Sequence, residues 1–255
     1  MTMLRRIRID IRNMGVLGWI LYSSDRVLDR FSAGRMRLWA FRFYAQPISE
    51  HPILPASHRR KISVGQVMPG EIDSRLFERP AGAIEERFQA GSICVAARSE
   101  EELAGFMWLH FGALRERLVE CDFEPTPAGR TCWDYDLEVF PHYRLGRTFA
   151  RLWDEANRLL RNRGVEASVS WISFWNLASR RAHVRMGAQP VGWMGVLDLF
   201  GWKAALQSRW PFLLLARPGR RLHVMVDASR AIAIHRVASS AAASGQSFDR
   251  QKPHA

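Results

Sequence analysis

Three carboxylates at every second position, Asp134, Asp136 and Glu138, are the residues of this sequence best suited to proton transfer. They lie in the segment 131–140, which alternates as a β-strand does, so the three side chains are expected on one face of that strand. Carboxylates this close repel one another, which can raise the pKa of one of them toward that of a useful base. We expect Asp136 to be the base and Glu138 to be the second candidate. A solvated strand face is the alternative.

A turn that contains Arg144, Gly146 and Arg147 follows this strand and leads into a helix predicted over 147–162. The first backbone N–H groups of a helix have no partners inside it, and the helix dipole adds partial positive charge there. The two arginines add full charges. The sequence therefore predicts an anion site, most naturally for phosphate, at the backbone from Gly146 to Thr148.

A second helix, 177–186, is predicted from Asn176 as its N-cap and Gly187 as its C-terminal stop. His183 lies on this helix, and an imidazole titrates near neutral pH, so it can exchange a proton with a reacting group. A histidine that only packs or caps the helix is the equally weighted alternative. Asn176 as a plain cap is likewise compatible with a second role in ligand binding.

The elements that would position these residues form one extended pattern of strands and helices. Gly105, inside a predicted strand, indicates a bulge or a close approach of two backbones. By alternation and helical periodicity, strands are predicted at 36–48, 61–68, 92–97, 103–111, 131–140, 165–173, 191–200, 211–216 and 221–226, and helices at 1–32, 71–90, 147–162 and 177–186.

The net charge of +12 and the isoelectric point near 10.8 favour anionic partners. No nucleic-acid-binding motif and no zinc-type spacing of cysteine and histidine is present in the sequence, so we expect neither nucleic acid nor a metal as partner. Three cysteines, Cys94, Cys121 and Cys132, show no close pairing, which suits a reducing cytoplasm.

Residues 1–32 have the pattern of one amphipathic helix with a basic start. Its apolar run, 14–22, is shorter than the ~20 residues that span a bilayer and has no small-residue cleavage site. The helix either packs on the body of the protein or lies on a membrane surface, which leaves a cytoplasmic location with peripheral membrane contact as an alternative to a purely cytoplasmic one.

Two segments together resemble the GNAT acyltransferase superfamily: Val139-Phe-Pro-His-Tyr-Arg-Leu-Gly-Arg-Thr148 and Asn176-Leu-Ala-Ser-Arg-Arg-Ala-His-Val-Arg-Met-Gly-Ala188. The first is similar to the pyrophosphate turn of that family and the second to the helix that flanks the thioester. The resemblance covers roughly 62–200. It implies an α+β (α/β) fold with a mixed, mostly antiparallel central sheet flanked by helices. We expect that domain over 49–230, an extension of helix and strand over 1–48, and a disordered tail over 231–255.

The resemblance also implies roles for individual residues. Acetyl-CoA or another acyl-CoA would be the co-substrate, and an amine the acceptor. The backbone of Leu137 and Val139 would pair with the pantetheine arm, and Asn176 and Ser179 would flank it. Arg144, Gly146, Arg147 and Thr148 would hold the phosphates, with more dependence on arginine than usual because the turn has one glycine. His183, where the family usually has tyrosine, would protonate the leaving thiolate.

The sequence thus predicts an N-acyltransferase that moves an acetyl or longer acyl group, from CoA or an acyl carrier, to an amine by direct attack in a ternary complex. Trp171 and Trp175 are expected to line a substrate pocket, with a tryptophan-rich core as the alternative. The competing function is non-catalytic: a CoA-binding sensor, or a basic module on membranes. The acceptor, the acyl length and the oligomeric state stay open.

Overall fold

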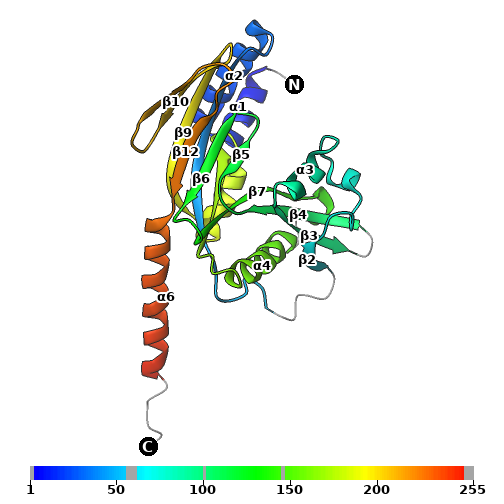
Figure 1. The fold of residues 1–255 in the computed structure, drawn as a ribbon, viewed down its shortest axis with the longest axis vertical. Helices are drawn as coiled ribbons and strands as arrows, with labels where there is room; N and C mark the ends of the chain where they lie inside the picture. Colours follow the sequence, from blue (N-terminus) through cyan, green and yellow to red (C-terminus); the bar gives the residue numbers. More distant parts are fainter. Residues whose placement is uncertain (1–2, 56–61, 100–101, 145–146, 250–255) are drawn as a thin grey trace, which may run out of the picture.

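The computed structural model describes residues 3–55, 62–99, 102–144 and 147–249. Its main feature is a nine-stranded sheet in the order β11-β10-β9-β1-β8-β7-β4-β3-β2, antiparallel at every neighbouring pair except β7 and β8 (Figure 1). The mixed, mostly antiparallel sheet flanked by helices that the GNAT resemblance implies is therefore confirmed. The strands of the sheet are β1 (Met36–Pro47), β2 (Ser63–Val67), β3 (Ile93–Ser99), β4 (Glu102–His110), β7 (Thr131–Val139), β8 (Ala167–Ser173), β9 (Gln189–Leu199), β10 (Trp202–Gln207) and β11 (Leu213–Ala216).

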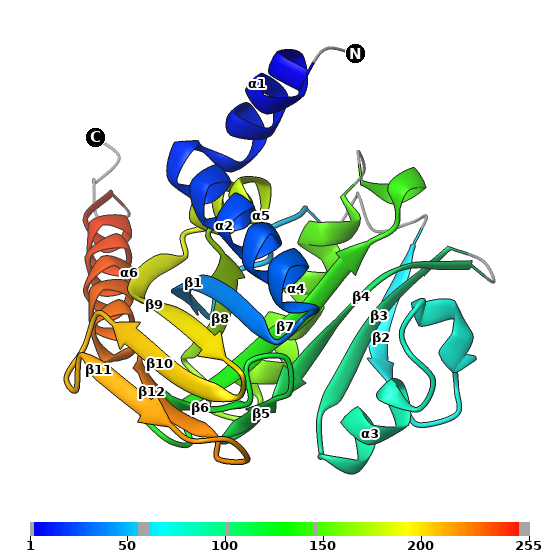
Figure 2. The ribbon, with the colours of Figure 1, turned by 90° about the horizontal axis from the view of Figure 1, so that it is seen from above.

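Most of the helices cover one face of the sheet, and the other face carries a small sheet and helix α3 (Ala83–Gln89) (Figure 2). The small sheet has the order β12-β6-β5, and it encloses with β1, β8 and β9 an aromatic core that includes Phe41, Phe123 and Trp133. The elements outside the large sheet are η2 (Ser74–Phe77), α3 (Ala83–Gln89), β5 (Leu114–Glu116), β6 (Cys121–Thr126), η3 (Pro141–Tyr143), α4 (Thr148–Arg161), α5 (Leu177–Arg185) and β12 (Leu222–Asp227).

The N-terminal segment is two helices and not the single helix predicted over 1–32. Gly15, with φ of 77°, separates α1 (Met3–Met14) from α2 (Val16–Ser32), because a left-handed backbone cannot continue a right-handed helix. Gly18 lets α2 pack closely, since a Cβ there would lie 3.0 Å from the carbonyl oxygen of Phe174. No helix in the described ranges is long and apolar enough to cross a bilayer.

Strand β1, which the sequence places in an N-terminal extension, lies inside the sheet between β8 and β9. It is antiparallel to β9 over 36–45 and to β8 over 41–47. At the other end of the chain, α6 spans Ser229–Asp249, within the tail predicted over 231–255, and residues 250–255 lie outside the described residues. Buried Ala231 and Ile232 fix its first turn, and the alanine-rich segment that follows has high helix propensity.

Strand β7 contains a bulge at Asp136, whose φ is 48°. The register with β4 shifts there, since Trp108 lies opposite Tyr135 but Phe106 lies opposite Glu138. Gly105 makes room for this irregular segment: a Cβ there would lie 2.6 Å from the carbonyl oxygen of Glu138. The close backbone approach predicted at Gly105 is confirmed, and the bulge reverses the alternation of the side chains beyond it.

Candidate active site

The two parallel strands β7 and β8 separate partway along their length. In the described part of the chain their pairing covers only 131–133 against 167–169, although β7 continues to Val139 and β8 to Ser173. Each strand then follows its other neighbour, β4 or β1. We call the segments 134–139 and 170–173 the β7–β8 divergence. The chain leads from β7 through η3 into α4, and from β8 into α5, so the next helix after each separating strand is α4 or α5.

A buried polar triad lies at the point where the strands separate. His183 on α5 directs Nε2 toward Asp134 Oδ1 at 3.9 Å, and Ser168 Oγ donates a hydrogen bond to Asp134 Oδ2 at 2.6 Å. The other ring nitrogen, Nδ1, lies 2.9 Å from the carbonyl oxygen of Ser179. A carbonyl can only accept, so Nδ1 carries a proton and Nε2 is the nitrogen that can exchange one.

Charge and burial shift the pKa of His183 in opposite directions. The side chain is nearly enclosed, and it packs edge to face against Phe149 and Trp153 of α4. Burial alone would lower the pKa of His183, but the nearby Asp134 carboxylate and the Ser179 carbonyl outweigh it and hold the pKa above its ordinary value. The Asp134 carboxylate thus stabilises the imidazolium form of His183 relative to the neutral form.

Three buried polar atoms on the borders of this region have no hydrogen-bond partner among the described residues: Thr148 Oγ1 and Trp153 Nε1 on α4, and Ser170 Oγ on β8. Buried polar groups are normally paired, so each of these atoms is available to a bound molecule or to water. Ser170 follows Ser168 by two residues, so it lies on the same face of β8 as the triad.

The three carboxylates do not share a face, so that prediction is wrong. Asp134 faces His183, whereas Arg79 Nε and Nη2 contact Asp136 at 2.9 and 2.5 Å, and Nη2 also contacts Glu138 at 2.7 Å. Arg87 forms a further ion pair with Asp136. The bulge at Asp136 is the cause, because a strand without it would keep the predicted alternation.

Ion pairing changes the acid–base character of Asp136. Burial raises its pKa, but hydrogen bonds and charge from Arg79 and Arg87 lower it by more, so the pKa lies below its ordinary value. This shift is opposite to the one that a general base near neutral pH needs. Glu138 lies on the same face and makes one short hydrogen bond, to Arg79.

The structure describes both ends of the turn at which a phosphate site is predicted. Gly146 lies outside the described residues. Arg144 is exposed and donates from Nε to the carbonyl oxygen of Val139 at 2.9 Å, so its side chain bends back over the end of β7. Arg147 is exposed at the N-cap of α4, and Thr148 is buried in the first turn. Two exposed guanidinium groups therefore flank the N-terminus of α4.

The remaining predicted residues lie on both sides of the divergence. The N-cap predicted at Asn176 is confirmed, since its Oδ1 accepts a hydrogen bond from Ser179 N at 3.1 Å. Trp171 packs edge to face on Phe41 in the aromatic core, with ring centroids 4.5 Å apart. Trp175 packs edge to face on Tyr22 of α2, with ring centroids 6.0 Å apart, so α2 adjoins the loop before α5.

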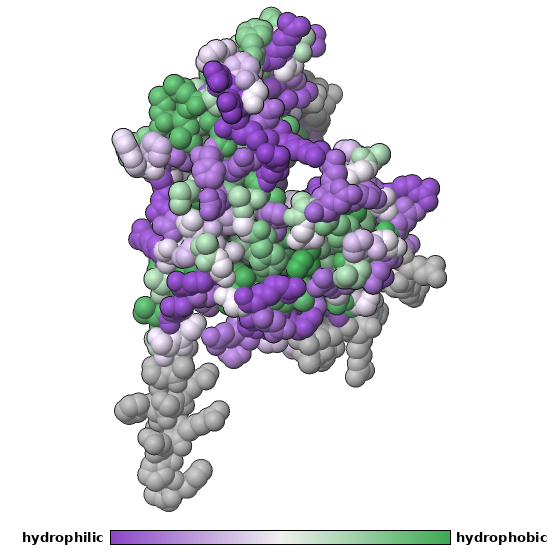
Figure 3. All heavy atoms as spheres, viewed as in Figure 1, coloured by the Kyte–Doolittle hydropathy of each residue, from purple (hydrophilic) through white to green (hydrophobic). Residues whose placement is uncertain are grey.

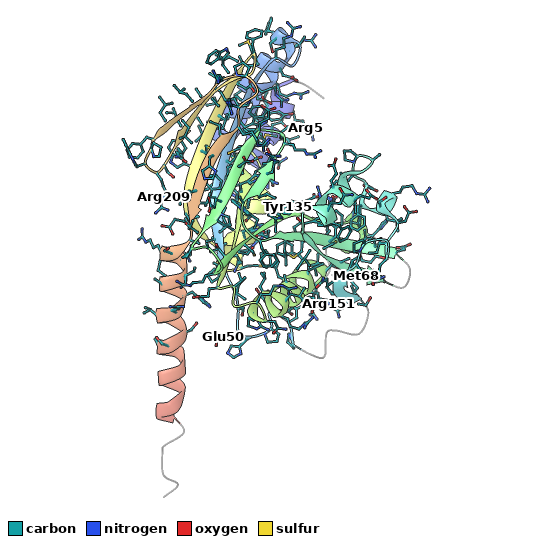
Figure 4. All side chains as sticks on the ribbon, viewed as in Figure 1. Arg5, Glu50, Met68, Tyr135, Arg151 and Arg209 are labelled. Atoms are coloured by element: carbon teal, nitrogen blue, oxygen red, sulfur yellow. The ribbon has the colours of Figure 1, made fainter. Side chains whose placement is uncertain are left out.

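Sequence reasoning missed the partners of the acidic residues. Ser168 is a single serine in a strand, and no local pattern marks it as a neighbour of Asp134. Arg79 and Arg87 belong to a segment about fifty residues before their carboxylates. The surplus of arginine over lysine was the available signal for these ion pairs, since arginine favours carboxylate pairing. Beside Asp136 on β7, Tyr135 lies at the centre of the molecule (Figure 4) and donates a hydrogen bond to Ser92 Oγ at 2.9 Å.

No protein-family model and no curated protein sequence matches this chain. Solved structures are similar to it in fold. A conserved protein of unknown function from Staphylococcus epidermidis matches 68% of this chain and 66% of its own length, at 9% identity and a TM-score of 0.45. A GCN5-related N-acetyltransferase from Kribbella flavida matches 66% and 62%, at 12% identity and a TM-score of 0.42.

A tandem GNAT protein from the clavulanic acid biosynthesis pathway matches 60% of this chain, at 15% identity and a TM-score of 0.40. The chain spans less than two thirds of the length of each of these three structures, 66%, 62% and 50%. The likeness is one of fold.

Proposed function

We propose that this protein transfers an acyl group from a CoA thioester to an amine. The observation that carries the proposal is the β7–β8 divergence, which lies between an arginine-flanked helix N-terminus and the buried pair of His183 and Asp134. A thioester needs a holder for its phosphates, a slot for its arm, and a proton donor for the departing sulfur. The proposal assigns these three tasks to the arginines before α4, to the edge of β7 that β8 leaves unpaired, and to His183.

Arg144 and Arg147, with the backbone of 146–148, would hold the phosphates of CoA. Leu137 and Val139 would offer backbone groups to the pantetheine arm on the side of β7 that β8 leaves unpaired. The Val139 carbonyl already accepts a hydrogen bond from Arg144, so this arginine would link the arm and the phosphates. The unpartnered oxygens of Thr148 and Ser170 give the ligand further polar contacts.

In the transfer step, the amine nitrogen would attack the thioester carbonyl, a C–N bond would form, and the C–S bond would break. The amine loses a proton and the thiolate gains one. His183 would supply the latter from Nε2, and Asp134 would stabilise the imidazolium before transfer. Nδ1 stays protonated on the Ser179 carbonyl, which fixes the ring orientation.

The base that takes the proton of the amine would lie on the other face of β7. Asp136 and Glu138 both project there, and a cationic amine is attracted to carboxylates. Glu138 becomes the first candidate, because Asp136 has two arginine partners and a lowered pKa. Comparing the acidic limbs of the pH–rate profiles of Glu138→Gln and Asp136→Asn separates them: the base is the residue whose loss removes the limb.

The test of the activity is direct. Purified protein is incubated with acyl-CoAs of increasing chain length and a panel of amines, and free thiol is measured together with the acylated amine by mass spectrometry. Amine-dependent thiol release that His183→Gln suppresses supports the proposal. Absence of turnover with every pair, at saturating acyl-CoA binding, would reject it.

A second candidate, a non-catalytic CoA-binding sensor, is favoured by one observation: both carboxylates on the acceptor face are already paired with Arg79. Acyl-CoA binding by calorimetry without turnover would support this function. For either function we propose a cytoplasmic location, since Cys94, Cys121 and Cys132 are buried and unpaired, as in reduced proteins.

A further inference from the structure

The outer face of the hairpin formed by β9, β10 and β11 is apolar and exposed. The register places Leu199 opposite Trp202, and Leu206 opposite Leu213, so their side chains project from one face. Trp202 is 63% exposed and Leu215 is 73% exposed. Residues on the inner face of the same strands, among them Met194 and Ala205, are instead buried in the aromatic core. This outer face therefore has no cover in the described structure.

The turn between β10 and β11 extends this apolar surface. Trp210 is 83% exposed and Phe212 is 58% exposed, and their rings pack edge to face at 6.1 Å. Two large aromatic side chains at the tip of a hairpin expose apolar area that a globular surface normally hides. Tryptophan is also the side chain that favours the boundary between water and lipid, because its ring is apolar and its N–H is polar.

Helix α2 adds a second apolar strip on the same side of the large sheet. Val16, Ile20, Val27 and Phe31 are exposed, and their spacing of four, seven and four residues puts them on one side of the helix. The opposite side, at Gly18 and Asp25, is the one that packs on the protein. Phe31 is 85% exposed, so the strip is not part of the core.

The two strips adjoin at the end of α2. Phe200, in the turn between β9 and β10, donates its backbone N–H to the carbonyl oxygen of Arg35 at 2.8 Å, and Met36 pairs with Leu199. Figure 3 shows hydrophobic residues gathered over the β10–β11 hairpin and at the end of α2. We call the two strips together the apolar face, defined by Val16, Ile20, Val27, Phe31, Leu199, Phe200, Trp202, Leu206, Trp210, Phe212, Leu213 and Leu215.

The chain that carries the apolar face is strongly basic. Residues 1–35 contain seven arginines against three aspartates, and residues 199–220 contain one lysine and three arginines with no acidic residue. Arg30, Arg35, Arg217 and Arg220 are exposed along its borders. Arg209, labelled on the hairpin side in Figure 4, pairs with Asp227 at 2.8 Å. An exposed apolar surface with a basic border has charge complementarity to an anionic lipid surface.

We infer that the apolar face docks on an anionic lipid bilayer, with the tip at Trp210 and Phe212 entering the headgroup region. The inference is independent of the acyl transfer proposed above. A second copy of this chain is the less favoured occupant, because it would bring an identical basic border against the first and the like charges would repel. The contact includes the hairpin as well as the N-terminal helices, so it is wider than residues 1–32.

The test is cosedimentation of the full chain with vesicles of phosphatidylcholine alone, and of phosphatidylcholine mixed in equal amounts with phosphatidylglycerol. We expect binding to the anionic vesicles that added salt weakens. Trp210→Ser with Phe212→Ser should reduce the bound fraction about tenfold, from the lost apolar burial. The matched control, Met68→Ser with Met225→Ser, changes two exposed apolar residues outside the face and should bind as the wild type does.

Charge is tested separately by Arg217→Glu with Arg220→Glu, which should weaken binding to the anionic vesicles. Arg115→Glu with Arg117→Glu makes the same change of net charge elsewhere on the surface and should weaken it less. Equal loss in both charge variants, or equal binding of wild type and tip variant, would overturn the inference. So would a dimer in sedimentation velocity that the tip variant dissociates, together with no vesicle binding.

Insertion of the tip has its own readout. Brominated lipids quench tryptophan fluorescence only at short range, and Trp210→Phe keeps an aromatic anchor while removing this fluorophore. The difference in quenching between wild type and Trp210→Phe should be positive on anionic vesicles. No difference, with binding retained, would show that the tip stays in water and would overturn this part of the inference.

Discussion

His183 Nε2 and Asp134 Oδ1 lie 3.9 Å apart at the point where β7 and β8 cease to pair. If this imidazolium protonates the leaving thiolate, His183→Gln should lower kcat about 100-fold with little change in the KM for acyl-CoA. Steady-state kinetics with the best amine gives both constants. His223→Gln, a change at an exposed histidine on β12, is the control and should retain full activity. A kcat equal to that of the wild type would exclude His183 as proton donor.

The basic limb of the pH profile of kcat should depend on both His183 and Asp134. Activity that needs protonated His183 falls as the pH rises through its raised pKa. Asp134→Asn removes the charge that raises the pKa and leaves the burial that lowers it, so the basic limb should move to lower pH. The amide can still accept the hydrogen bond from Ser168. A limb that stays in place would assign it to another group.

The pair of His183 and Asp134 should also make the free energy of unfolding depend on pH. A raised pKa means that protonated His183 contributes stability which is fully present below its ordinary pKa of 6.5 and is lost as the pH rises through the raised value. The free energy of unfolding should therefore decline across that window in the wild type and much less in His183→Gln. Urea unfolding at a series of pH values measures it. Parallel curves for the two proteins would contradict the linkage.

Phosphate binding should depend on the exposed arginines beside α4. Arg147→Ala should raise the KM for acyl-CoA about tenfold, because a charge-assisted hydrogen bond to phosphate is lost. At saturating acyl-CoA, kcat should be close to normal. Arg158→Ala, in the last turn of α4, is the control, since that arginine pairs with Glu155. A KM unchanged in Arg147→Ala would place the phosphates elsewhere.

The Asp136 ion pairs should stabilise the fold only while Asp136 is charged. Its pKa is lowered from 3.8, so the contribution is present above 3.8 and is lost as the pH falls through the lower folded value. Asp136→Asn keeps a residue type that tolerates the positive φ and should cost about 2 kcal/mol near neutral pH. The difference from wild type should shrink in acid. A constant difference at all pH values would point to strain instead of charge.

Gly105 should be intolerant of a side chain. A Cβ at this position would lie 2.6 Å from a backbone oxygen that cannot move independently, so Gly105→Ala should lower the free energy of unfolding by about 2 kcal/mol or more. Gly65→Ala, in β2 with open space around its Cβ position, is the matched control and should be neutral or slightly stabilising. Equal thermal midpoints for the two variants would mean that the bulge adjusts freely.

Local signals in the sequence were sufficient for most elements of the sheet and for both site helices. The apolar face of α4 repeats at helical spacing, and α5 has a side-chain cap at Asn176 and a left-handed glycine at Gly187. Strand β10 was missed although Trp202, Ala204 and Leu206 alternate with buried residues. Its exposed face is the apolar one, which reverses the usual pattern of polar residues outward.

Other features were decided by contacts that the sequence does not encode locally. The bulge places the side chain of Asp136 on the opposite face of β7 from Asp134. There its carboxylate pairs with Arg79 and Arg87, while the backbone of β7 continues to pair with β4. The insertion of β1 between β8 and β9 joins segments more than a hundred residues apart.

The sequence by itself determined which residues could do chemistry, and the tertiary structure decided which of them meet. His183 and Asp134 were both marked by their types, but 48 residues separate them in the chain, and only the packing of α5 on the β7–β8 divergence brings them together. Periodicity is a property of neighbours along the chain, whereas a site is a property of neighbours in space.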